Sequence, residues 1–283
     1  MRRTWWHGSG DRAPMPWHSP CPHASQTQQF VTGASSSSSS AAQPQSKPSA
    51  PPQPKPAGQQ PQAFKYLQLD LPAPLNARVI SSKFVKSSTK ISDCPPDGKP
   101  EFATIGRSNV GKSSIINSLC SNDKLAKVSK EPGMTKLINH FLINDSWYLV
   151  DLPGYGFSRT AGKEARTEWL AFTKDFFISR DSLVHVMLLV DSSLPPQQVD
   201  VDCANWLAEC EVPFAIVFTK VDHAKKQGPS PAQNITAFKK LLAKDWRALP
   251  WCFETSSKTG AGSAEVLGYL ASLRQMHKQT GGR

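Results

Sequence analysis

A phosphate-binding loop is predicted at residues 106–113, which read GRSNVGKS and match the pattern G-x-x-x-x-G-K-[ST] once in the chain. An apolar stretch at 102–105 precedes it and a helical pattern begins at Lys112, which is the strand–loop–helix context that such a loop needs. Glycines let the backbone wrap around a phosphate, and the loop amides and the helix N-terminus then face the anion. Lys112 is expected to place its charge between the β- and γ-phosphates, and the Ser113 hydroxyl to bind Mg²⁺. We therefore predict a nucleotide site, rather than a glycine-rich turn without a ligand, that includes Gly106, Arg107, Ser108, Asn109, Val110, Gly111, Lys112, Ser113 and Ser114.

Two further segments suit the γ-phosphate and its metal ion. Residues 151–154 read DLPG and directly follow the apolar stretch 147–150. A carboxylate at this strand end is typical of the Mg²⁺-associated Asp, although strand-end aspartates before Pro-Gly also form ordinary turns. In the loop 132–135, PGMT, a threonine hydroxyl can complete the metal shell when a γ-phosphate is present. We therefore predict that Lys112, Thr135 and Gly154 act in catalysis, that Ser113 and Thr135 bind the metal, and that Gly133, Met134, Asp151, Leu152 and Pro153 line the site.

The base is predicted from residues 219–222, TKVD, which follow the apolar stretch 214–218. Guanine presents N1–H and a 2-amino group as adjacent donors, and the Asp222 carboxylate can accept both, whereas adenine would meet it with a lone pair. The aliphatic stem of Lys220 can lie over the base. The loop 255–258, TSSK, can bring its backbone to the guanine O6. These segments favour GTP over ATP, with Thr219, Lys220, Val221, Asp222, Ser256, Ser257 and Lys258 at the base.

The elements that position these loops are short apolar runs alternating with helical patterns. Strands are predicted at 102–105, 137–143, 147–150, 183–190, 214–218 and 251–254, and helices at 112–120, 162–178, 197–211, 231–244 and 263–277. The residues Asn144-Asp145-Ser146 between the second and third strands are typical of a hairpin turn. Strands that alternate with helices form mainly parallel sheets covered on both faces. The sequence therefore predicts an α/β fold with a mixed, mainly parallel, six-stranded sheet.

The chain resembles the EngB/YihA (YsxC) family of P-loop GTPases. The resemblance rests on GRSNVGKSSIINSL at 106–119, PGMTKLINHFLIN at 132–144, WYLVDLPGYGFS at 147–158 and FTKVD at 218–222. The lead-in CPPDGKPEFATIGRS at 94–108 agrees, and the resemblance extends over roughly residues 64–278. It implies a Ras-like three-layer fold, GTP and GDP as ligands, Mg²⁺ as cofactor and a role in assembly of the large ribosomal subunit. In eukaryotes it implies an organelle of bacterial ancestry.

The resemblance leaves the hydrolytic mechanism partly open. Ras-like enzymes orient the attacking water with a Gln just after D-x-x-G, and this chain has Tyr155 there. Water positioning is therefore expected from the backbone, a monovalent cation or a partner, with slow intrinsic turnover. In related GTPases an Asn at the position of Asn109 helps to hold K⁺, while a loop-capping Asn is the alternative. Met134 replaces a common Lys, and Phe157-Ser158 a common Tyr-Ala, at positions without a phosphate or base role.

Composition divides the chain into a leader and a domain. Residues 1–63 hold eleven of the 24 prolines, a serine run at 35–40, and five basic residues against one acidic residue. Such a segment cannot bury enough apolar surface to offset its ordering entropy, and its composition is that of a transit peptide; an ordinary disordered tail is the alternative. We predict a leader at 1–63, a GTPase domain at 64–278, a disordered tail at 279–283, a plastid or mitochondrial location (otherwise cytoplasmic) and a monomer.

Charge and hydropathy limit the partners. The net charge of +11 suits an anionic neighbour such as rRNA or the large ribosomal subunit, and the apolar run at 183–190 is too short to span a membrane. Basic residues near the C-terminus form either an rRNA-facing patch or a solvated face: Lys225, Lys226, Lys239, Lys240, Lys244, Arg247, Arg274 and Lys278. Two other functions stay open, a GTP-dependent interaction module in organelle division or membrane recruitment and a P-loop kinase or ATPase; Asp222 disfavours the second.

Overall fold

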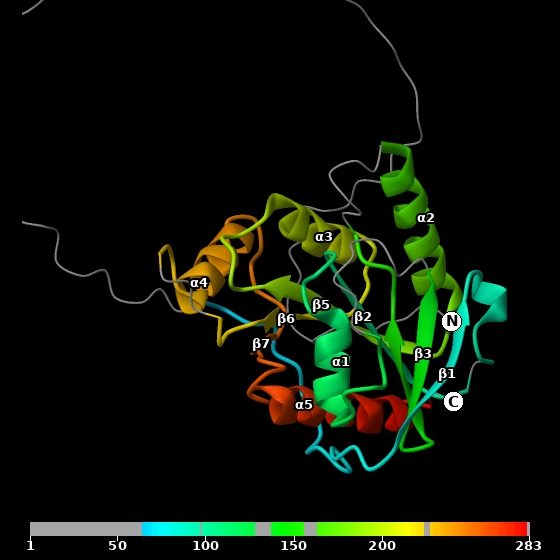
Figure 1. The fold of residues 1–283 in the computed structure, drawn as a ribbon. Coiled ribbons are helices and arrows are strands. Elements are labelled where there is room, and N and C mark those ends of the chain that lie inside the picture. The colour runs from blue at the N-terminus through cyan, green and yellow to red at the C-terminus, as the bar shows by residue number, and fades with distance from the viewer. Residues whose placement is uncertain (1–63, 97, 128–136, 156–162, 224–226, 282–283) are drawn as a thin grey trace, which may run out of the picture. The chain divides into compact units, whose positions relative to one another are not determined.

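A seven-stranded mixed sheet forms the centre of this computed structural model, which describes residues 64–281 except 97, 128–136, 156–162 and 224–226. The strand order is β1-β3-β4-β2-β5-β6-β7 (Figure 1). In this spatial order, the five strands β4-β2-β5-β6-β7 pair in parallel, and β3 is antiparallel to both β4 and β1. The strands are β1 (Ser82–Ser88), β2 (Glu101–Gly106), β3 (Ile138–Ile143), β4 (Trp147–Asp151), β5 (Leu183–Asp191), β6 (Phe214–Thr219) and β7 (Cys252–Glu254).

Helices cover both faces of the sheet, as predicted. Because side chains alternate along a strand, Phe102 joins the apolar cluster on one face and its neighbour Ala103 joins the cluster on the other. α1 (Lys112–Cys120) and α5 (Ser263–Gln279) pack on the Phe102 face, and Figure 1 shows α5 on the opposite side of the sheet from α3. The Ala103 face is covered by α2 (Lys163–Ser179), α3 (Gln198–Glu209) and α4 (Pro231–Leu242).

The predicted count of six strands is wrong because β1 was missed. Phe84 and Val85 on β1 are 52% and 39% exposed, so this edge strand buries little and leaves no hydrophobic pattern. Its backbone pairing with β3 holds it in place, with a register shift between Phe84 and Lys86. The predicted hairpin between β3 and β4 is confirmed, with positive φ angles at Asn144 and Asp145 that fit a tight turn.

Residues 65–81 form an N-terminal strap that extends from the β7 side of the sheet to the β1 side. At one end the Leu67 amide donates to the Leu249 carbonyl (2.8 Å), just before β7. In the middle the Arg274 guanidinium of α5 donates to the Asn76 carbonyl (2.8 Å). At the other end the Asn144 side chain accepts from the backbone amide of Ser81 (3.0 Å). The strap therefore ties α5 and the β3–β4 turn to the start of the domain.

Two histidines and three aromatic residues of α2 are buried. His140 and His185 are buried, with exposed fractions of 0% and 4%. Trp169, Phe176 and Phe177 of α2 lie in the core of the Ala103 face. Among the described residues, none of the helices is long and apolar enough to cross a membrane.

Candidate nucleotide site

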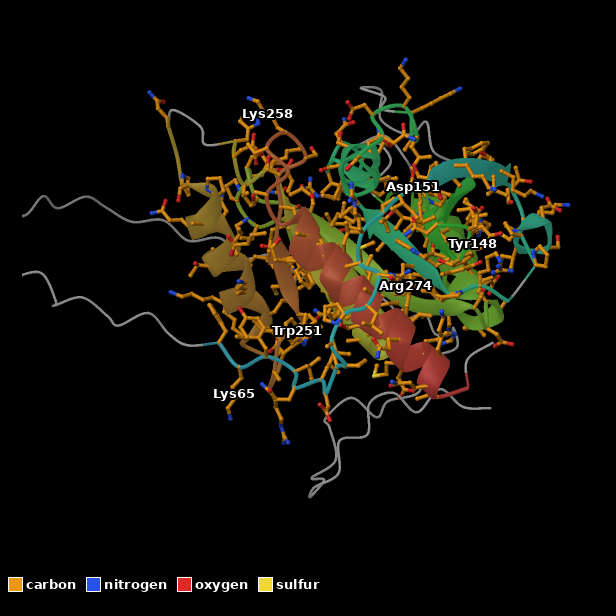
Figure 2. All side chains as sticks on the ribbon, turned by 90° about the horizontal axis from the view of Figure 1, so that it is seen from below. Lys65, Tyr148, Asp151, Trp251, Lys258 and Arg274 are labelled. Carbon is orange, nitrogen blue, oxygen red and sulfur yellow. The ribbon has the colours of Figure 1, made fainter. Side chains whose placement is uncertain are left out.

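The predicted motifs meet at the edge of the sheet where its parallel strands have their C-terminal ends. β2, β4, β6 and β7 all run parallel, so the loops that follow them leave from the same edge. Lys258 follows β7 at this edge, whereas Trp251 precedes β7 at the opposite edge (Figure 2). Topology therefore brings together the four loops that the sequence assigned to phosphate, metal and base.

The loop between β2 and α1 has a backbone suited to an anion. Gly111 is the N-cap of α1 with a φ of 106°, a left-handed conformation that favours glycine, and Asn109 has a φ of 63°. Because Gly111 has no side chain, it cannot cap the first amides of the helix. The loop is braced from β6, since the Thr219 hydroxyl donates to the Val110 carbonyl (2.6 Å). A helix N-terminus without a side-chain cap, beside a loop held from β6, is the arrangement that binds phosphate.

Lys112 and Asp151 form an ion pair where the phosphates and metal are expected. The Lys112 Nζ lies 3.5 Å from Asp151 Oδ1, with the two side chains 9% and 3% exposed. Burial raises the pKa of Asp151 above its ordinary value, and the Lys112 ammonium opposes that rise. The Thr104 hydroxyl, on β2, also lies 3.5 Å from Asp151 Oδ1. Lys112 is thus largely buried, and its ammonium contacts a carboxylate rather than the apolar core.

Gly154 lies directly against the phosphate-binding loop. A Cβ added at Gly154 would stand 2.8 Å from the Gly106 carbonyl oxygen and 3.4 Å from the Ser108 nitrogen. The next residue, Tyr155, donates its amide to the same Gly106 carbonyl (3.2 Å). On the other side, the Pro153 carbonyl accepts from Trp169 Nε1 (2.9 Å). The segment after β4 is therefore in backbone contact with the loop after β2.

The two predicted base loops also touch each other. The Val221 amide donates to the Thr255 carbonyl (3.2 Å). The Ser256 hydroxyl bonds to the exposed Asp222 and holds the pKa of that carboxyl below its ordinary value. Ser256 is itself buried, and its hydroxyl oxygen accepts from the Lys258 amide (3.2 Å). Asp222 is thus an ionised acceptor at the surface, beside the loop predicted to reach the guanine O6.

Asp191 is a site residue that the sequence reading missed. Its Oδ2 lies 2.6 Å from the Lys220 Nζ, and that ammonium also donates to the Asn109 carbonyl (2.8 Å). Lys220 is held in a left-handed conformation with a φ of 61°. Asp191 therefore fixes the lysine stem that was predicted to lie over the base. A signal for it existed, because Asp191 ends β5 as Asp151 ends β4.

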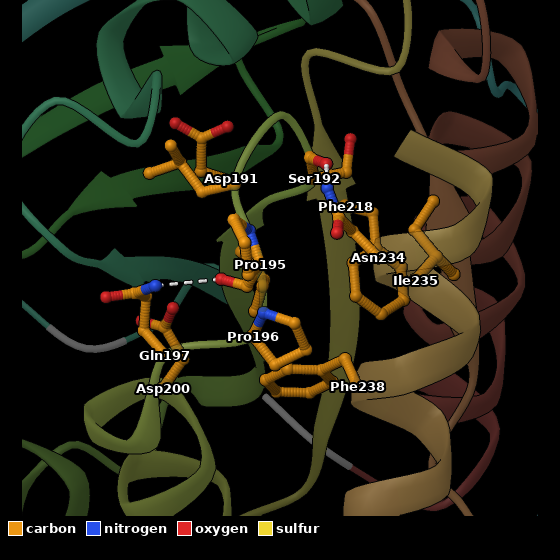
Figure 3. A pocket seen from close by; sticks show the side chains of 12 residues that line it. Asp191, Ser192, Pro195, Pro196, Gln197, Asp200, Phe218, Asn234, Ile235 and Phe238 are labelled. Carbon is orange, nitrogen blue, oxygen red and sulfur yellow. Dashed lines mark hydrogen bonds between the residues drawn. The ribbon is translucent and has the colours of Figure 1, made fainter. Parts of the chain in front are cut away.

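A small pocket that Asp191 helps to line lies between the loop after β5 and α4 (Figure 3). Pro195, Pro196 and Phe238 are among the residues that line it. Its polar groups bond within the fold, since Asn234 Nδ2 donates to the Ser192 carbonyl (2.9 Å) and Gln197 Nε2 to the Pro195 carbonyl (2.8 Å). These bonds hold the loop that leads from Asp191 to α3.

The other predicted site residues divide into two groups. Arg107 turns its guanidinium toward Asp200 of α3, with Nε 2.9 Å from Oδ1. Ser113 and Ser114 open α1, Leu152 is buried after β4, and Ser257 is exposed. Gly133, Met134 and Thr135 lie outside the described residues. The described residues bring the loops after β2, β4, β6 and β7 to one edge of the sheet.

The fold and the site together define a class of protein. A mixed, mainly parallel sheet covered by helices has a phosphate-type loop after β2, an aspartate at the end of β4 and an exposed carboxylate after β6. This is the arrangement of a P-loop nucleotide-binding protein.

Known proteins identify the family. The family model described as 50S ribosome-binding GTPase matches residues 101–220. The GTP-binding protein At2g22870 of Arabidopsis thaliana is 49% identical over 205 residues, 72% of this chain and 68% of that protein. The probable GTP-binding protein EngB of Bacteroides fragilis is 45% identical over 197 residues, 70% of this chain and 96% of that protein. A crystal structure of a probable GTP-binding protein engB covers 62% of this chain and 99% of its own, with 19% identity and a TM-score of 0.45. The chain belongs to the EngB family of GTP-binding proteins, and it is a GTPase.

Proposed function

We propose that this GTPase binds its nucleotide at the sheet edge described above, with Lys112 and the loop amides at the phosphates and Asp222 at the guanine. The observation that carries the proposal is the convergence of three contacts: Lys112 with Asp151, Gly154 with Gly106, and Asp222 with Ser256. Lys112 and Gly154 would stabilise charge on the γ-phosphate, and Thr135 would join them from the loop 132–135. The Asp151 carboxylate lies beside Lys112 and would help to hold the metal.

We further propose that Mg²⁺ accompanies the nucleotide. The Ser113 hydroxyl and the Asp151 carboxylate are hard oxygen donors at neighbouring loops, which is the chemistry that Mg²⁺ prefers. Thr135 is the third proposed donor. Bound there, the ion would neutralise charge that develops on the phosphates. K⁺ stimulation through Asn109 is a separate prediction, and hydrolysis rates compared in KCl and NaCl decide between it and a loop-capping role.

The proposed role is a switch in assembly of the large ribosomal subunit within an organelle. Its support is the family description, which names the 50S ribosome, together with the net charge of +11 and the transit-like composition of residues 1–63. The predicted basic patch includes two residues, Lys239 and Arg274, whose charged groups contact other side chains of the protein. Lys239 lies 3.8 Å from Glu254 Oε1 and close to the Tyr66 ring, and Arg274 packs over Trp147 at 4.9 Å. Lys240, Lys244, Arg247 and Lys278 are exposed and remain candidates for an RNA contact.

Sedimentation with ribosomal particles tests this role. The protein with a non-hydrolysable GTP analogue should sediment with large-subunit particles, and it should do so less with GDP. Lys112→Ala serves as the control because it removes the proposed phosphate charge, together with the ion pair to Asp151. Sedimentation that is equal in all three cases, or none at all, would contradict the switch and would favour the recruitment alternative. A fusion of residues 1–63 to a fluorescent protein tests the leader, which should direct the fusion into an organelle.

A further inference from the structure

Asp200 is a buried carboxylate on the first turn of α3 that joins two loops of the nucleotide site. It is 0% exposed. Its Oδ1 accepts from Arg107 Nε (2.9 Å) and from the Tyr155 hydroxyl (2.8 Å), and its Oδ2 accepts from the same Arg107 nitrogen (3.0 Å). Burying a carboxylate is costly unless it is paired and hydrogen-bonded. Both groups that offset this cost come from loops of the site rather than from α3.

The two residues that Asp200 binds belong to segments already in contact. Arg107 is the second residue of the phosphate-binding loop, and Tyr155 immediately follows Gly154. Their backbones form a parallel bridge. Asp200 therefore clamps the side chains of two segments whose spacing determines where the Gly154 amide stands relative to the phosphates.

Tyr155 is placed as an anchor and not as a water-positioning residue. Its side chain is 4% exposed, and its hydroxyl donates to Asp200 on α3. Burial, and then nearby charges that include Asp200, raise the pKa of Tyr155 well above its ordinary value, so the hydroxyl stays a donor. Trp169 of α2 provides a second anchor, since Nε1 donates to the Pro153 carbonyl and the ring contacts Tyr155 at 5.7 Å between centroids. Both neighbours of Gly154 are thus fixed to helices.

We propose that Asp200 is a positioning residue for the triphosphate: through Tyr155 and Arg107 it holds the Gly154 amide where it can bond to a γ-phosphate. The inference rests on the proposed role of Gly154. GDP has no γ-phosphate, so its affinity does not depend on the position of that amide. The consequence is specific, because weakening the clamp reduces affinity for GTP, and the hydrolysis rate, more than affinity for GDP.

Tyr155→Phe is the sharpest test because it removes only the hydroxyl that Asp200 accepts. Affinity for a non-hydrolysable GTP analogue should fall by up to roughly tenfold, because the displaced Gly154 amide loses a hydrogen bond to a charged group, while GDP affinity stays within about twofold. The matched control is Tyr269→Phe, which also removes a buried hydroxyl contact, to His185 Nε2 (3.3 Å), remote from the site edge. It should leave both affinities unchanged. Thermal melting of each variant reports folding separately.

Two substitutions at Asp200 provide an independent test. The Asp200→Asn side chain keeps the shape and one acceptor oxygen, so it should retain more discrimination between the GTP analogue and GDP than Asp200→Ala. A Tyr155→Phe protein that binds both nucleotides as the wild type does, or loses both equally, would overturn the proposal, as would Asn and Ala variants of equal discrimination. Failure of the nucleotide-site assignment looks different, because Lys112→Ala would then keep wild-type affinity for both nucleotides.

Discussion

Replacing Gly154 by alanine is expected to push the segment after β4 away from the phosphate-binding loop. The new Cβ would stand 2.8 Å from the Gly106 carbonyl oxygen, about 0.6 Å short of the 3.4 Å at which ordinary contact begins. The Gly106 oxygen and the Ser108 nitrogen are backbone atoms, so no side-chain rotation can relieve the clash. Overpacking of this kind costs about 1–3 kcal/mol. A domain of this size should lose about 2–4 °C in melting temperature per kcal/mol.

The same displacement should weaken binding of the triphosphate. If the Gly154 amide no longer reaches the γ-phosphate, a hydrogen bond to a charged group is lost, which is worth about 1.5–3 kcal/mol, or roughly 10- to 150-fold in affinity. Isothermal titration with GDP and with a non-hydrolysable GTP analogue measures this, and phosphate release measures the hydrolysis rate. The analogue affinity and the rate should fall, and GDP affinity should fall less.

Gly268→Ala is the matched control for that experiment. Gly268 lies inside α5, and a Cβ added there meets nothing within 4 Å. Alanine should therefore stabilise the helix by about 0.5–1 kcal/mol and leave nucleotide binding unchanged. A Gly154→Ala protein that melts and binds like Gly268→Ala would refute the reasoning, because the close backbone contact would then not exist in solution.

Three further outcomes are expected. Lys112→Ala should lose GTP binding while the protein still melts cooperatively, and wild-type affinity in titration calorimetry would contradict the site. Asp222→Asn should bind XTP better than GTP, since the amide donates where the carboxylate accepted; a retained GTP preference in competition binding would exclude the base-reading role. His185 should make the protein less stable in acid, because desolvation lowers its pKa from 6.5 to about 3 and only the unfolded chain then takes up a proton. Between these pH values the unfolding free energy of the wild type should fall relative to that of His185→Gln by up to about 1.4 kcal/mol per pH unit, and parallel urea-unfolding profiles would count against this.

The sequence was informative where the role of a polar residue could be inferred from its place at the end of an apolar strand. Asp151 and Asp222 could be assigned because each follows an apolar run and parallel strands end at one edge. The hairpin at Asn144-Asp145 could be predicted from local turn chemistry, and the positive φ angles confirm it. Local pattern and parallel topology were therefore enough to predict which loops lie together.

What the sequence did not predict depends on long-range contacts. The residues next to Asp200 in the sequence do not indicate its role, because its partners Arg107 and Tyr155 lie 93 and 45 residues away in the chain. An acidic residue in the first turn of a helix is ordinarily explained by the helix dipole alone. β1 was missed because main-chain pairing with β3, and not side-chain burial, determines it. Pairing partners of this kind leave no periodic signal.

The N-terminal strap has a consequence for the order in which the domain completes its fold. The first residues of the domain bond to some of the last: the Leu67 amide meets the Leu249 carbonyl, and the Arg274 guanidinium meets Asn76, 198 residues away in the chain. During synthesis the strap emerges before both partners, and Arg274 does not exist until much of α5 has been translated. Contacts of such long sequence separation form late because the loop they close is entropically costly. A shortened chain that ends before Arg274 would therefore leave the strap without its partner on α5. Deleting C-terminal residues should thus weaken the packing of the strap first.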